Sequence, residues 1–125
     1  MKVNYLTLGG QRHPVCFSLG AGEELVEKCG VDLSELPDML SGGSIAERFH
    51  AVDTMLTVLL KYGRQYAKYA GERVPDPLPC RPIDLIGIDE IDDVTSAIFG
   101  LISKDAETSV ELETDSKNAE TTQGE

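Results

Sequence analysis

Two short runs of alternating apolar and polar residues stand at the start of the chain, on either side of a Gly-Gly pair. A period of two is typical of a strand with one buried face, and Gly9 and Gly10 accept the positive φ of a tight turn. The pattern predicts a β-hairpin over residues 3–19. Because a two-stranded hairpin is marginal in water, we expect it to pack on helices, on a second copy, or on both.

The apolar spacing then changes to that of helices. It predicts a helix over about 21–29, ended by Gly30. A second short helix is predicted over 34–40, with Pro37 in its first turn, where the missing N–H costs little.

The strongest helical pattern covers residues 44–70. Ser44 and Glu47 have the spacing of a capping box, in which each side chain satisfies a backbone N–H at the helix start. Apolar or small residues recur in steps of four and three and predict one buried face. A second apolar stripe, on the adjoining face, consists of Met55, Val58, Tyr62, Tyr66 and Tyr69.

The second stripe makes the apolar face wider than one packing partner usually covers. Either another helix of the same fold or a partner chain is expected to cover it. We take four of its residues as the candidate partner-binding surface: Met55, Val58, Tyr62 and Tyr69.

A proline-rich connection over 74–82 separates this helix from the C-terminal part. Four prolines there exclude a regular helix or a central strand. A short helical turn is predicted over 82–86, followed by a final helix over 89–103 capped by Asp89. The fold class predicted is therefore α+β, mainly α: an N-terminal hairpin followed by a small helical bundle with one long central helix.

Charge separates a folded body from a tail. The chain carries a net charge of -11, with 22 Asp and Glu against 11 Lys and Arg, and the acids crowd beyond residue 103. Residues 104–125 contain few apolar side chains to offset the entropy of ordering. They are predicted to be a disordered acidic tail behind a domain of residues 1–103. The acidity also argues against nucleic acid or an anionic membrane as a partner.

Candidate chemistry is sparse. Five residues could suggest a metal or a nucleophile: His13, Cys16, Cys29, His50 and Cys80. Their spacing lacks the paired ligands of a zinc site, and no glycine-rich turn presents a cysteine for attack. We therefore expect no metal, no cofactor and no enzymatic activity. The odd number of cysteines and the absence of a signal-peptide pattern or a membrane-spanning run favour the cytoplasm.

Three local sequences stand in this order of elements: Phe17-Ser18-Leu19-Gly20-Ala21, Leu59-Leu60-Lys61-Tyr62-Gly63-Arg64-Gln65-Tyr66-Ala67, and Val94-Thr95-Ser96-Ala97-Ile98-Phe99. Together they resemble the tail assembly chaperones of long-tailed (siphovirus-type) bacteriophages and prophages, over roughly residues 1–103. The resemblance implies a non-enzymatic protein that binds the tape measure protein, keeps it soluble and helps recruit tail tube subunits. It also implies self-association, action in the host bacterial cytoplasm, and absence from the mature virion.

The resemblance further implies a programmed frameshift near the end of the gene. Ser116-Lys117-Asn118 could be encoded UCA AAA AAC, which contains a heptamer on which two tRNAs re-pair one base back. A ribosome that slips there would extend the acidic tail into a second domain.

Two hypotheses from other functional classes stay open. One is a small acidic regulator or nucleic-acid mimic that occupies a basic site on another protein, which the charge favours. The other is a small enzyme that uses Cys16 or Cys80.

Overall fold

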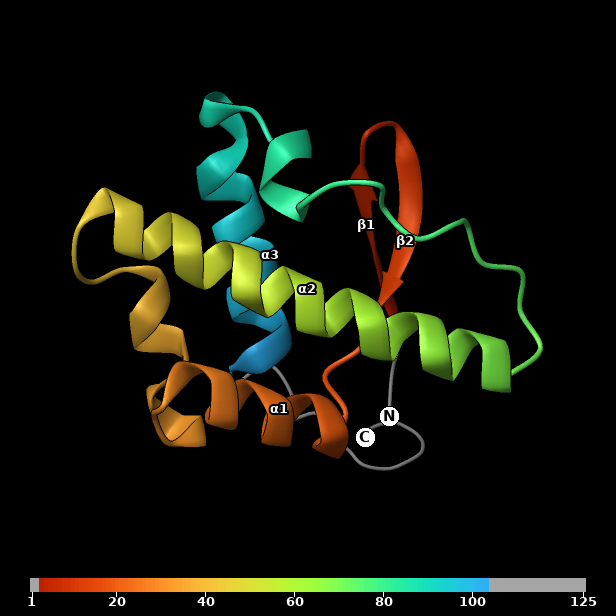
Figure 1. Ribbon diagram of the computed structural model, residues 1–125, viewed down its shortest axis with the longest axis horizontal. Coiled ribbons are helices and arrows are strands. Elements are labelled where there is room, and N and C mark those ends of the chain that lie inside the picture. The colour runs from red at the N-terminus through yellow and green to blue at the C-terminus, as the bar shows by residue number, and fades with distance from the viewer. Residues whose placement is uncertain (1–2, 104–125) are drawn as a thin grey trace, which may run out of the picture.

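The computed structural model describes residues 3–103 and has the predicted fold class, a β-hairpin followed by helices around one long central helix (Figure 1). The strands are β1 (Asn4–Leu8) and β2 (Gln11–Val15). The α-helices are α1 (Leu19–Cys29), α2 (Ile45–Tyr69) and α3 (Ile91–Ile102). Short 3-10 helices are η1 (Leu33–Glu35), η2 (Pro37–Leu40), η3 (Pro82–Leu85) and η4 (Ile88–Glu90).

The hairpin turns at the Gly-Gly pair, as predicted. Leu8 pairs with Gln11, and Gly9 and Gly10 between them have φ of 59° and 82°. The strands end at Val15, short of the predicted boundary at 19. The reason is a change of partner, because the Cys16 N–H donates to the Leu59 carbonyl of α2, 3.2 Å away, instead of extending the hairpin.

A glycine allows this contact between β2 and α2. A Cβ on Gly63 would lie 2.6 Å from the Val15 Cα and closer still to the Pro14 carbonyl group. Only a residue without a side chain lets the two backbones approach this closely. The hairpin therefore packs directly on the helix backbone, which confirms the predicted packing on helices.

The first two predicted helices differ from the structure in their bounds or type. α1 begins at Leu19, two residues early, because Ser18 caps it by accepting a bond from the Ala21 N–H at 3.2 Å; Gly30 ends it with φ of 70°, as predicted. The single helix predicted over 34–40 is instead the pair η1 and η2. The break comes at Pro37, whose nitrogen has no hydrogen to donate to the helical ladder.

The capping box of α2 is confirmed. The Glu47 N–H donates to the Ser44 hydroxyl at 3.1 Å, and the Ser44 N–H donates to the Glu47 carboxylate at 2.8 Å.

The C-terminal part also departs from the prediction in one detail. The turn at Pro82 forms as η3, but Asp89 does not cap the last helix. Instead the Gly87 N–H donates to the Glu90 carboxylate at 2.7 Å, which closes η4 ahead of α3. Asp89 lies inside η4, so its backbone is already helical and lacks the extended conformation of an N-cap residue.

Residues 104–125 lie outside the described part of the chain, and with them the predicted disordered tail and the Ser116-Lys117-Asn118 sequence. Over residues 3–103, none of the helices combines the length and the apolar character needed to cross a bilayer.

Candidate functional site

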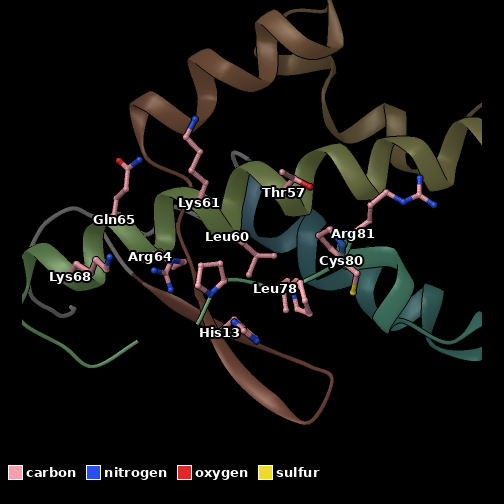
Figure 2. Close-up of a pocket in the computed structure, with 13 residues that line it drawn as sticks. His13, Thr57, Leu60, Lys61, Arg64, Gln65, Lys68, Leu78, Cys80 and Arg81 are labelled. Carbon is pink, nitrogen blue, oxygen red and sulfur yellow. The ribbon is translucent and has the colours of Figure 1, made fainter. Parts of the chain in front are cut away.

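A groove of about 750 Å³ runs along the C-terminal half of α2 (Figure 2). One side is α2 itself, and the other is the proline-rich connection after the helix. We call it the α2 groove, and define it by its lining residues: His13, Thr57, Leu60, Lys61, Arg64, Gln65, Lys68, Pro77, Leu78, Pro79, Cys80, Arg81 and Pro82.

The floor of the groove is apolar. Leu60 comes from α2 and half-buried Leu78 from the connection, with three prolines beside them. Prolines hold the connection extended and give it no helical hydrogen bonds of its own. Arg64 anchors it, because a guanidinium N–H donates to the Pro75 carbonyl. The groove is thus a preformed slot between a helix and an extended strap.

The rim of the groove is basic although the chain is acidic. Lys61, Arg64, Lys68 and Arg81 line it, four of the 11 Lys and Arg in the chain, and no Asp or Glu is among the described lining residues. Lys61 pairs with Glu24 at 2.9 Å and Arg81 with Asp84 at 3.8 Å. Within residues 3–103, neither Arg64 nor Lys68 has a carboxylate within ion-pair distance. Two cations therefore remain available to a bound anionic group.

His13 adds a buried polar atom to the same place. The side chain, on β2, is 2% exposed, and its Nε2 has no hydrogen-bond partner in the described part of the chain. Burial, and to a smaller degree the Arg64 cation, lower the pKa of the imidazole, which favours the neutral ring. An unsatisfied buried polar atom costs free energy unless a partner arrives.

The predicted partner-binding surface is wrong in two of its four residues. Met55 and Val58 are 0% exposed and belong to the core. Helix α1, the hairpin, η2 and α3 all pack against α2, so the fold itself covers both stripes in this region. Of the two alternatives that the sequence left open, burial by the same fold applies to Met55 and Val58.

The two tyrosines have different surroundings. Tyr62 is half-buried against Gly20 of α1, and its hydroxyl donates to Glu24 at 3.0 Å. Tyr69 is 87% exposed at the end of α2, with its ring centroid 6.3 Å from that of Tyr66. Of the four residues, Tyr69 alone presents most of its side chain for a partner.

The histidines and cysteines do not converge. Over residues 3–103, no three His, Cys, Asp or Glu side chains are placed to hold one metal ion. Cys16 is buried, Cys29 is half-buried and Cys80 is exposed at the groove. Burial raises the pKa of the Cys16 and Cys29 thiols, which disfavours the reactive thiolate.

Sequence reasoning missed the α2 groove. No binding role was predicted for Lys61, Arg64 or Lys68, which lie on the long predicted helix. The usable signal was their spacing of three and four, which gathers cations on one face of a helix in an acidic chain. The other wall comes from residues 77–82, and only the tertiary structure brings the strap beside that face.

No protein-family model, curated protein or solved structure matches the chain.

Proposed function

We propose that this protein is a tail assembly chaperone of a long-tailed bacteriophage or prophage. It binds the tape measure protein, keeps that long apolar protein soluble, and helps recruit tail tube subunits in the host bacterial cytoplasm. It is absent from the finished virion. The observation that carries the proposal is the α2 groove, a preformed apolar slot that can hold a segment of a client chain.

The sequences that carry the resemblance support the proposal by their place in the fold. The first two form one structural unit: the Cys16 N–H, next to Phe17, bonds to Leu59, and Tyr62 packs on Gly20. Lys61 of the second sequence pairs with Glu24 of α1. In the third, Ile98 is buried in the core.

The size and chemistry of the groove fit the client of such a chaperone. Its volume lies in the range of pockets that enclose several side chains. An apolar floor with a polar rim takes up apolar side chains while the rim remains hydrated. The basic rim gives no support to the alternative of a nucleic-acid mimic, since a mimic presents acids where this face presents cations.

Co-expression tests the proposal. The protein is produced together with the large helical protein encoded by the next long reading frame, and the soluble fraction of that client is measured. We expect the client to be soluble only when the chaperone is present and to co-purify with it. A client that stays insoluble in the presence of the wild-type chain contradicts the proposal.

A matched pair of variants localises the effect to the groove. Leu78→Ser removes an apolar side chain from the groove, and Ile88→Ser removes one that is 77% exposed on η4, outside the groove lining. Leu78→Ser should lower the yield of soluble client several-fold, and Ile88→Ser should leave it unchanged. Thermal unfolding of both variants controls for loss of fold.

A further inference from the structure

Three features of the α2 groove retain binding capacity that the described chain does not fill. The floor is open and apolar, Arg64 and Lys68 have no carboxylate partner within residues 3–103, and His13 Nε2 lacks a hydrogen-bond partner there. A ligand that uses all three has apolar side chains, carboxylates, and a further polar group that can bond to the imidazole. An extended acidic peptide has this chemistry, since its backbone supplies the polar group.

The chain contains such a segment outside the described residues. Residues 109–114 read Ser-Val-Glu-Leu-Glu-Thr, and Val110 and Leu112 are the only larger apolar residues between 104 and 125. Successive side chains of an extended chain point to opposite faces. Val110 and Leu112 would therefore share one face, with Glu111 and Glu113 on the other.

The short connection between α3 and this segment favours binding to the groove of another molecule. Val110 is seven residues beyond Ser103, so the connecting chain spans at most about 25 Å. α3 ends on the same side of α2 as α1, whereas the strap that closes the groove passes on the opposite side (Figure 1). To fill the groove of its own molecule the segment would have to go around α2, and half the circumference of a helix about 10–12 Å in diameter takes about 16–19 Å, most of that span. A second copy imposes no such detour.

We propose that the α2 groove is a binding site for an extended acidic peptide, and that residues 109–114 of a second copy of this chain occupy it. The apolar face of the segment lies on Leu60 and Leu78, and its carboxylates meet the rim cations, Arg64 and Lys68.

Docking in this way joins copies head to tail, with each groove holding the tail of the next molecule. The tail fills the groove until another ligand displaces it. That this ligand is the client protein rests on the proposed function. The docking itself rests on the groove alone, so purified chain without a client tests it.

Two variants of the full chain separate groove from tail. Lys68→Glu reverses a rim charge on an exposed helix position, which spares the core. Val110→Ser combined with Leu112→Ser removes the apolar face of the segment. Sedimentation equilibrium gives the mass of the wild type, of each variant alone, and of an equal mixture of the two, against the monomer mass of 13.6 kDa.

The wild type should exceed the monomer mass increasingly with concentration and return toward it when the salt is raised to about 0.5 M, where exposed charges are screened. Each variant alone should stay monomeric. The mixture should associate, because the intact groove of one variant receives the intact tail of the other. A wild type that is monomeric at all concentrations, variants that associate as well as the wild type, or a mixture that stays monomeric would each overturn the proposal.

Discussion

At the scale of single residues, Gly63 determines how the hairpin meets the helix. A glycine within a helix normally costs about 1 kcal/mol relative to alanine. Here the smaller residue stabilises the fold, since a Cβ would lie 2.6 Å from the Val15 Cα on a strand backbone that has no flexible side chain to move away. The need for close contact reverses the usual preference.

Gly63→Ala should therefore lower the free energy of unfolding by about 3 kcal/mol, the upper end of overpacking costs. Gly100→Ala is the matched control, because Gly100 lies within α3 with open space around its Cα. That variant should gain up to about 1 kcal/mol. Urea unfolding of the two measures both changes, and a Gly63→Ala variant as stable as Gly100→Ala contradicts the described contact.

His13 makes stability depend on pH. Its pKa in the folded chain is lowered, chiefly by burial, so the unfolded chain binds the proton more readily. The stability that the neutral imidazole contributes is complete above the pKa of histidine in the unfolded chain, about 6.5. It is lost as the pH falls through that value toward the lower pKa of the folded chain. The urea midpoint should drop between about pH 7.5 and about pH 5.5. His13→Gln should reduce that drop, and an equal drop in both proteins would show that another group causes it.

At the scale of elements, the sequence predicts features set by neighbouring residues, and it does not predict features set by tertiary contacts. The Ser44 capping box, the Gly30 helix end and the Gly-Gly hairpin all follow from residues a few positions apart, and the structure confirms each. The burial of Met55 and Val58 depends on which elements surround α2. The groove likewise depends on how the connection folds back, so it left no short-range pattern beyond the cation spacing.

The α2 cap should contribute measurably. Ser44→Ala removes the hydroxyl that accepts from the Glu47 N–H and should cost about 1 kcal/mol. Ser41→Ala nearby removes only a long 3.5 Å bond to the Asp38 carbonyl and should change stability by less than about 0.5 kcal/mol. Thermal unfolding compares the two, and equal effects would argue against the capping box as the source.

The second stripe divides into core and surface. Met55→Ala should cost about 2–5 kcal/mol, as expected for truncating a fully buried side chain. Tyr69→Ala should stay within about 0.5 kcal/mol, because its ring is exposed. Calorimetry on the two variants checks this division. A Met55→Ala chain that keeps wild-type stability would restore the interpretation of the stripe as a free surface.

At the scale of the whole molecule, the fold concentrates cations where the chain as a whole is acidic. Acidic residues elsewhere repel one another and anionic surfaces. The α2 groove combines a basic rim with an apolar floor and a buried imidazole, and it lies where the hairpin, the helix and the strap meet. This arrangement supports the proposal that the groove binds a segment of another chain.

Photo-crosslinking in cells that express the neighbouring large helical protein tests that account most directly. A photoreactive amino acid replaces Gln65, which is exposed at the groove, or Asp93, which is exposed on α3 outside the groove lining. Mass spectrometry then identifies the crosslinked chains. The account predicts that position 65 captures the large helical protein and position 93 does not. Capture from position 93 alone, or equal capture from both positions, would contradict the groove as the client site.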